Sequence, residues 1–308
     1  GYNWQTIRDN IIRTIGSAMP AMLILLLIGS LSGTWLLSGV VPVMIYYGLD
    51  IIHPSIFLFA SVIVSAVVSL ATGSSWSTIA TIGVALLGIG STLGIPEGIV
   101  AGSIISGAYF GDKMSPLSDT TNLAPAMTGT DLFTHIRYMM FTTVPTLLIT
   151  LVIFLVIGFN QDFADQAVHI GKVKTAIGNT FNTTPFLFAV PVLLITIIIK
   201  KVPPIPSLLA GTLLGGLFAV VFQWDIVASL AQDVPNYGVG SYVVVMQAMF
   251  GDLAISTANP VVNDLLQTTG MAGMLDTIWL ILSAMVFGGV MESGGLLVRI
   301  TQAIMRMV

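Results

Sequence analysis

Long apolar stretches separated by short polar breaks dominate the chain. A helix that crosses a membrane needs about 20 mostly apolar residues, because each residue adds about 1.5 Å and the hydrocarbon core is about 30 Å thick. Stretches close to this length occur at residues 17–37, 55–72, 78–94, 138–159, 184–200, 203–222 and 276–292. The pattern therefore predicts an all-α polytopic membrane protein.

Four further segments fit this pattern less well. Residues 97–111 are apolar, but as a helix they would reach only about 22 Å, less than the hydrocarbon core. Residues 294–308 form an amphipathic piece. The connections 160–183 and 224–274 are longer and more polar, and we expect them to be surface loops and interfacial helices on the outer side.

Composition supports membrane insertion and argues against several functions. Hydrophobic residues make up 55% of the 308 residues and charged residues only 8%, whereas a soluble domain has about 25% charged residues. The absence of cysteine excludes disulfides and thiolate metal sites within this sequence. The net charge of −4 is spread thinly and predicts no nucleic-acid surface. No nucleotide-binding loop or metalloprotease helix occurs, so we expect neither an enzyme nor a bound cofactor.

The basic residues predict an orientation. If the spans alternate, Lys172 and Lys174 fall on one side and all other basic residues on the opposite side. These others are Arg8, Arg13, Lys113, Arg137, Lys200, Lys201, Arg299 and Arg306. By the positive-inside rule, we expect the Arg8/Arg13 end to be cytoplasmic. We expect a multi-pass protein in the lipid bilayer of the cell (inner) membrane. This holds whether residues 55–94 form two spans or a re-entrant hairpin.

Glycines recur between residues 83 and 111 and predict close helix packing. Small residues let transmembrane helices approach one another. Gly98 and Gly102 form a GxxxG pair, which we interpret as a packing contact. Elsewhere, the Gly/Ser pattern of residues 29–39 weakly resembles that of residues 288–295, as an internal repeat would.

The most informative polar strip is residues 107–125. Two carboxylates, a lysine, two prolines and several hydroxyl and amide groups lie here between apolar stretches. A helix that stops at Gly111 would expose carbonyls with a partial negative charge. Hard oxygen ligands suit alkali cations, and this strip offers Asp112, Ser115, Ser118, Asp119, Thr120, Thr121 and Asn122. The alternative is a solvated cytoplasmic loop.

A second polar break occurs at residues 72–78. Thr72, Gly73, Ser74 and Ser75 let the chain turn tightly and present hydroxyl and carbonyl oxygens. Two breaks only about 35 residues apart, each flanked by apolar helix, could face each other across one site. The alternative is an ordinary polar turn at the membrane surface, with Trp76 as an interfacial anchor.

Residues 72–126 resemble the NhaC-type sodium/proton antiporter family. The resemblance rests on Gly73-Ser74-Ser75-Trp76, on Gly83-Val84-Ala85 and above all on the continuous run from Ser106 to Asn122. Weaker similarity extends upstream through residues 35–48 and downstream to residues 287–292. Most of the chain is therefore covered.

The resemblance implies the architecture of the ion transporter superfamily. Each of two inverted repeats would contain a re-entrant hairpin and a broken helix, on a scaffold that often forms a homodimer. Here the hairpin would be residues 55–94 with its tip at 73–77, and the broken helix would be residues 97–136. We therefore expect residues 1–308 to be one transporter domain, truncated at both ends, with the first repeat and the start of the second. Its ion-binding region would be residues 55–136.

The resemblance also implies exchange of Na⁺ for H⁺, with these ions as cargo. A carboxylate can hold Na⁺ or H⁺ but is poorly placed to hold both. We expect Asp119 to be the leading exchanging group and Asp112 the second. The expected ion-binding residues are Asp119, Asp112, Ser118, Thr120, Thr121, Asn122, Gly73, Ser74 and Ser75, with Na⁺ at Asp119, Thr120, Asn122 and Ser75. The expected supporting residues are Lys113, Ser115 and Thr72.

Two other functions stay open. One is a Na⁺- and H⁺-coupled organic-anion exchanger, because the family includes malate/lactate antiporters. Its small carboxylate substrates would need a cation, for which Lys113 is the nearby candidate in the sequence. The other is a non-transporting membrane scaffold or a truncated relic.

Overall fold

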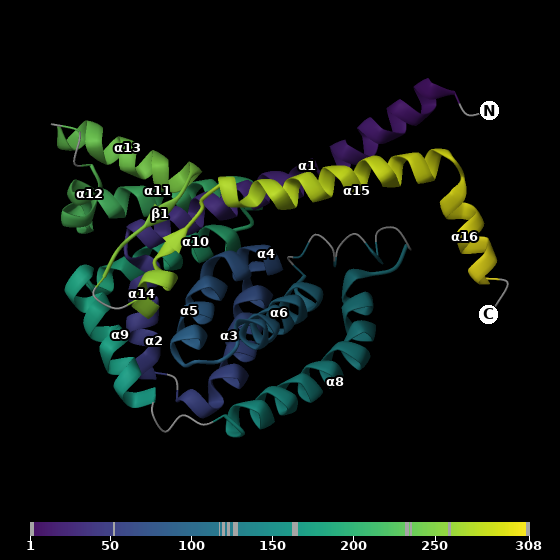
Figure 1. Ribbon diagram of the computed structural model, residues 1–308. Coiled ribbons are helices and arrows are strands. Elements are labelled where there is room, and N and C mark those ends of the chain that lie inside the picture. Colours follow the sequence, from purple (N-terminus) through teal and green to yellow (C-terminus); the bar gives the residue numbers. More distant parts are fainter. Residues whose placement is uncertain are drawn as a thin grey trace.

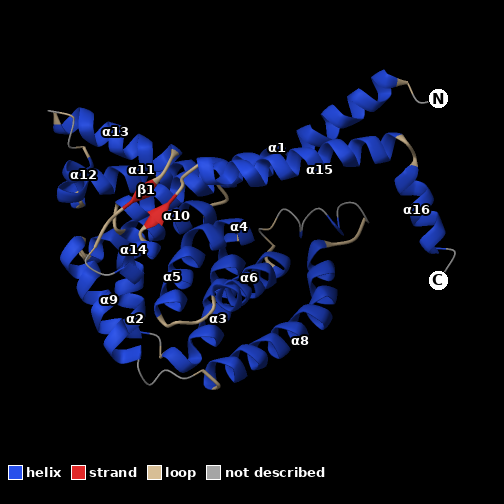
Figure 2. Cartoon of the chain, viewed as in Figure 1, coloured by secondary structure: helices blue, strands red, loops and turns tan. Residues whose placement is uncertain are grey.

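The computed structural model describes residues 3–51, 53–116, 118, 121, 124–125, 129–161, 166–231, 234, 236–257 and 260–305. Helices account for most of these residues (Figure 1). Figure 2 shows that the strands are confined to one small two-stranded antiparallel hairpin, β1 (Leu253–Ala254) with β2 (Gln267–Thr268). The predicted all-α class is confirmed.

The first helix is longer than predicted. Helix α1 runs from Trp4 to Leu37, and the side chain of Asn3 caps it by accepting a hydrogen bond from the Gln5 amide. Its 34 residues reach about 50 Å, more than a membrane core requires. Gly39, at φ 78°, separates α1 from α2 (Val40–Ile51). The short polar N-terminal stretch therefore belongs to the same helix as the predicted span.

Residues 54–114 form the centre of the structure in Figure 1. A 3₁₀ turn (Pro54–Ile56) leads into α3 (Phe57–Thr72), and α4 (Ser75–Thr78) passes through a π-helical turn (Ile79–Gly83) into α5 (Val84–Thr92). Helix α6 (Glu97–Met114) then packs along α3. The predicted hairpin thus consists of two helical arms that meet at residues 73–74.

The second half of the chain is also helical. Its larger elements are α8 (Leu132–Phe159), α9 (Gln166–Thr180), a 3₁₀ turn (Pro185–Phe188) with α10 (Ala189–Ile199), α11 (Pro204–Phe222), α12 (Trp224–Leu230), α13 (Tyr237–Phe250) and α14 (Pro260–Leu265). A 3₁₀ turn (Ala272–Met274) leads to α15 (Leu275–Ser293) and α16 (Leu296–Met305).

The length and composition of the helices identify candidate membrane spans. Within the described residues, six helices are long and apolar enough to cross a membrane: Trp4–Leu37, Pro54–Thr72, Ser75–Thr92, Leu132–Phe159, Pro204–Phe222 and Ala272–Ser293. A seventh is added if Ile170–Thr180 and Pro185–Ile199, which meet at 93°, count as one bent span. Both hairpin arms meet the criterion, so the re-entrant form of residues 55–94 stays a prediction.

The connections 160–183 and 224–274 are more than surface segments, which corrects our expectation. Helix α9 buries Val173 and Ile177 in the core against α2 and α5. Helix α13 packs on α1, where a side chain at Gly33 would overlap the Ala248 carbonyl. We expected these segments to lie at the surface because polar residues, which remain exposed, interrupt their apolar faces.

Close packing of α3 on α6 depends on two glycines. A Cβ at Gly107 would lie 2.2 Å from the Val62 carbonyl oxygen, and one at Gly111 would lie 2.4 Å from the Leu70 amide nitrogen. A Cβ added at Gly98 would meet nothing within 4 Å, and one at Gly102 would make only an ordinary contact. The GxxxG prediction was therefore wrong in its residues, because the glycines that pack closely lie further along the helix.

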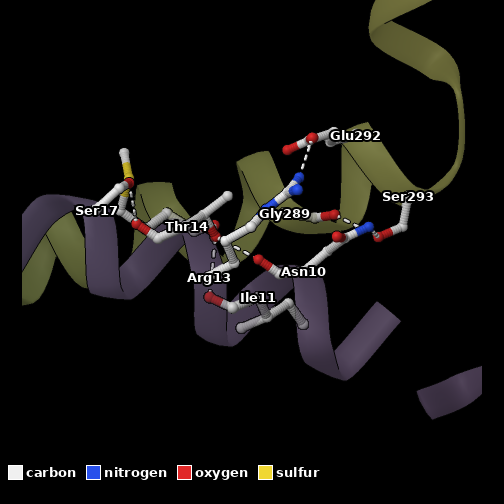
Figure 3. Close-up of polar contacts among 9 residues, drawn as sticks. Asn10, Ile11, Arg13, Thr14, Ser17, Gly289, Glu292 and Ser293 are labelled. Atoms are coloured by element: carbon white, nitrogen blue, oxygen red, sulfur yellow. Dashed lines mark hydrogen bonds and ion pairs between the residues drawn. The ribbon is translucent and has the colours of Figure 1, made fainter. Parts of the chain in front are cut away.

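Helices α1 and α15 lie side by side and extend from the body of the protein (Figure 1). Figure 3 shows their polar contacts: Asn10 donates to Ser293 at 2.7 Å, and Arg13 forms an ion pair with Glu292. The Thr14 hydroxyl donates to the Met285 carbonyl at 2.9 Å. The N-terminal part of α1 thereby contacts α15, whose Ser293 lies 283 positions after Asn10 in the sequence.

The breaks after α1 and α15 have the same form. Gly39 and Gly295 both have positive φ, at 78° and 63°. Each donates its amide to the carbonyl three residues earlier, and each preceding residue donates to the carbonyl four residues earlier. The helix ends at Gly94 and Lys201 have the same form, so this is a common helix C-cap, and the internal repeat stays a prediction.

Candidate ion-binding site

The tip of the α3–α4 hairpin is built by Gly73 and Ser74. Gly73 ends α3 in the left-handed conformation at φ 70°, where glycine avoids the strain that a Cβ would cause. Ser74 caps α4 by accepting a hydrogen bond from the Ser77 amide. The chain can therefore reverse within two residues and present the buried Ser75 at the start of the next arm.

The facing element is the C-terminal end of α6. We expected this helix to stop at Gly111, and that expectation was wrong. The helix continues through Met114 and is capped at Ser115, whose amide donates to the Gly111 carbonyl. Asp112 consequently lies in the last turn of a regular helix, which fixes the direction of its side chain.

Asp112 receives two serine hydroxyls. Ser75 Oγ donates to Asp112 Oδ2 at 2.9 Å, and Ser118 Oγ donates to Asp112 Oδ1. Ser75 and Ser118 are almost fully buried, whereas Asp112 is half-buried. The two predicted polar breaks therefore meet at one carboxylate.

Other hydroxyls that we expected to bind or support an ion hold the backbone in place. Thr121 Oγ1 lies 3.0 Å from the Asp112 carbonyl oxygen and 3.1 Å from that of Lys113, where it caps the end of α6. Ser115 Oγ donates to the Leu70 carbonyl at 2.8 Å and ties α6 to α3. The Thr72 and Thr78 hydroxyls lie 3.4 Å apart across the hairpin tip. These contacts position Asp112 and the tip relative to each other.

A partly open cavity of about 580 Å³ adjoins Asp112. Its walls come from the hairpin tip, the end of α6, Ile24 of α1, Ile198 of α10 and residues 201–204 at the start of α11. Thr72, Gly73, Ser74 and Ser118 contribute to the lining. Lys201 also lines the cavity, whereas Lys113 is exposed and is absent from the described lining. Sequence reasoning missed Lys201 because it lies 89 positions from Asp112 and follows an ordinary apolar helix.

Three of the expected ligands cannot be placed. Asp119, Thr120 and Asn122 lie outside the described residues, so the expected roles of Asp119 as leading exchanger and of all three as Na⁺ ligands stay predictions. In the described part of the chain, no three His, Cys, Asp or Glu side chains cluster as a metal site. The Asp112 group offers one carboxylate and neutral oxygens, a ligand set that suits a hard monovalent cation.

Comparison with known proteins shows that the sequence is similar to antiporters. A family model described as the Na⁺/H⁺ antiporter family matches residues 107–308. The malate-2H⁺/Na⁺-lactate antiporter of Bacillus subtilis is 40% identical over 96% of this chain and 60% of its own length. The Na⁺/H⁺ antiporter NhaC of Alkalihalophilus pseudofirmus is 35% identical over 98% of this chain and 62% of its own length.

A second NhaC antiporter, from Bacillus subtilis, is 35% identical over 99% of this chain and 65% of its own length. The chain thus spans about three-fifths of the length of these relatives. No solved structure matches it. The family model covers most of the chain and includes the Asp112 motif, and the helical, membrane-spanning architecture agrees with it. The chain belongs to the Na⁺/H⁺ antiporter family.

Proposed function

We propose that this chain forms the ion-binding part of a Na⁺/H⁺ antiporter, with Asp112 as a carboxylate at which Na⁺ and H⁺ compete. The observation that carries the proposal is the convergence of Ser75 and Ser118 on Asp112 beside an accessible cavity. Ser75 comes from the hairpin tip and Ser118 from the strip after α6, so two separate breaks contribute ligands to one point.

The chemistry of the cluster suits exchange. Each serine donates its single hydroxyl hydrogen to Asp112 and retains lone pairs that can coordinate a cation. With Asp112 ionised, the carboxylate and the two hydroxyl oxygens attract Na⁺. Protonation removes the negative charge and weakens Na⁺ binding, so the two cations bind in competition. Movement of one helix bundle against the rest would expose the cluster alternately to each side.

Asp119 remains our predicted leading exchange group. It follows Ser118 directly, so both carboxylates would lie in one strip and their roles can be separated by substitution.

We further propose that the protein lies in the cell membrane with the Arg8/Arg13 end in the cytoplasm, acts by transport and not by catalysis, and forms a homodimer. With this orientation, Lys201 lies on the cytoplasmic side.

A second candidate function is coupled exchange of a small organic carboxylate together with Na⁺ and H⁺. The relative at 40% identity, a malate-2H⁺/Na⁺-lactate antiporter, favours it. This function would use the same cation site, because its named relative also exchanges Na⁺ and H⁺.

The test uses everted membrane vesicles that contain the full-length protein. Added Na⁺ should dissipate an acid-inside pH gradient, monitored with a pH-sensitive dye. We expect Asp112→Asn to abolish this response, because the amide keeps the shape of the side chain but cannot carry the charge. Asp50→Asn is the matched control, since Asp50 forms an exposed ion pair with Lys174 and does not line the cavity.

Two results would contradict the proposal. A full response in Asp112→Asn, together with its loss in Asp119→Asn, would assign the exchange to Asp119 alone. No Na⁺ response in the wild-type protein, with correct membrane insertion, would exclude Na⁺/H⁺ exchange as the activity.

A further inference from the structure

A lysine at the end of α10 shares the cavity with Asp112. Lys201 follows the last turn of α10, and its backbone amide donates to the Ile198 carbonyl at 2.8 Å. Its side chain is exposed and lines the cavity. Asp112 and Lys201 are the two charged residues in the described lining, so the cavity presents one negative and one positive group.

The backbone at Lys201 is unusual for a residue with a side chain. Its φ is 64°, in the left-handed region, and all the other positive-φ residues in the described chain are glycines. Helix ends in this conformation favour glycine, because a Cβ crowds the following carbonyl. Glycine would therefore serve the chain reversal with less strain than lysine.

The charge of Lys201 is not neutralised within the protein as far as the structure describes it. Lys174 forms an ion pair with Asp50, and Arg13 forms one with Glu292, but Lys201 has no ion-pair partner among the described residues. The ammonium group can therefore bind an anion that enters the cavity.

The cavity is also much larger than a cation requires. A volume of about 580 Å³ falls in the range of about 300–1,000 Å³ that is typical of pockets for small organic molecules. A Na⁺ ion at Asp112 would occupy only a small part of the cavity volume. Na⁺ at one wall and the lysine ammonium at another would together attract an anion between them.

We infer that Lys201 recognises the carboxylate of a small organic anion that occupies this cavity beside Na⁺. The inference rests on the proposed Na⁺/H⁺ exchange and deepens the second candidate function, to which it adds the residue that selects the carboxylate. Lysine can bind carboxylate through any of its three ammonium hydrogens, so it selects for charge and not for one exact shape.

The test uses the full-length protein in proteoliposomes. Na⁺-dependent uptake of radiolabelled L-lactate, L-malate and succinate is measured, and uncharged lactamide serves as a competitor that lacks the carboxylate. In the wild-type protein, at least one carboxylate should be taken up, and lactamide should not compete. Lys201→Gln should raise the half-saturating carboxylate concentration at least tenfold and retain a Na⁺/H⁺ response without carboxylate.

Three variants separate the charge of Lys201 from its structural position. Lys200→Gln is the matched control, because Lys200 is an exposed neighbour that is absent from the described lining; it should leave uptake unchanged. Lys201→Arg should retain uptake. Lys201→Gly relieves the positive-φ strain, so it should keep or raise the thermal unfolding temperature while carboxylate uptake is lost.

The outcomes are distinct. A wild-type protein that exchanges Na⁺ for H⁺ but takes up none of the three carboxylates overturns the inference and leaves the proposed function intact. Loss of the Na⁺/H⁺ response in Lys201→Gln also overturns it, since the lysine would then act in cation exchange. Absence of both activities in the wild-type protein contradicts the proposed function itself.

Discussion

Ser75 and Asp112 lie 37 residues apart in the chain, yet the Ser75 hydroxyl donates a hydrogen bond to the Asp112 carboxylate at 2.9 Å. The contact joins the tip of one helical hairpin to the last turn of the next helix. Neither residue could form a cation site alone, because one is neutral and the other would be a lone carboxylate. The close packing of α3 on α6 brings them together.

Removal of the Ser75 hydroxyl should weaken cation binding. A hydrogen bond to a charged group contributes about 1.5–3 kcal/mol, so Ser75→Ala should raise the half-saturating Na⁺ concentration about tenfold or more. Na⁺ titration of the vesicle response measures this change. Ser77→Ala is the control on the same helix, since the buried Ser77 Oγ has no hydrogen-bond partner in the described structure. Equal effects of the two variants would contradict the assignment of Ser75.

A side chain at Gly111 should push α6 away from α3. The added Cβ would lie 2.4 Å from the Leu70 amide nitrogen, and backbone atoms cannot rotate aside as a side chain can. We expect Gly111→Ala to lower the free energy of unfolding by about 1–3 kcal/mol, measured in detergent. Gly102→Ala, on the same helix, adds only an ordinary contact 3.7 Å from Phe154 and should be neutral or slightly stabilising. A stable Gly111→Ala variant would show that the two helices pack less closely.

The contact between α1 and α15 should depend on Gly289 more than on its exposed ion pair. A Cβ at Gly289 would lie 2.9 Å from the Ile11 Cα, whereas one at the adjacent Gly288 meets nothing within 4 Å. Gly289→Ala should therefore lower the thermal unfolding temperature, and Gly288→Ala should not. The Arg13–Glu292 pair is largely solvent-exposed, and pairs of this kind contribute at most about 1 kcal/mol. A larger loss in Arg13→Ala than in Gly289→Ala would reverse this ranking.

The cavity should be accessible to water, while the outer surface of α3 should face lipid. Trp76 lines the cavity and is 45% exposed, and Val67 on α3 is 61% exposed. Because the sequence contains no cysteine, a single introduced cysteine gives a clear signal. A charged, membrane-impermeant thiol reagent applied from the cytoplasmic side should label Trp76→Cys and leave Val67→Cys unmodified. Labelling of both would place α3 outside the membrane, and labelling of Trp76→Cys only from the opposite side would reverse the orientation.

The span prediction succeeded where apolar length alone decides the element. The predicted stretches 55–72, 203–222 and 276–292 differ from α3, α11 and α15 by no more than a few residues at either end. The expectation of surface segments failed at α9 and α13, whose mixed faces are buried only because other helices cover them. The end of α6 was also misplaced, since Gly111 is a packing residue and not a helix terminus.

The sequence by itself determined that the chain is a helical membrane protein and that its chemistry is concentrated in residues 72–78 and 107–125. Hydropathy and rare polar residues can be read along one dimension, because insertion into lipid depends on each stretch separately. Only the tertiary structure decided that Ser75 and Ser118 meet at Asp112, and that Lys201 lines the same cavity while Lys113 is absent from its described lining. Those relationships depend on which helices approach one another, and here the approach is governed by glycines whose missing side chains allow backbones to touch.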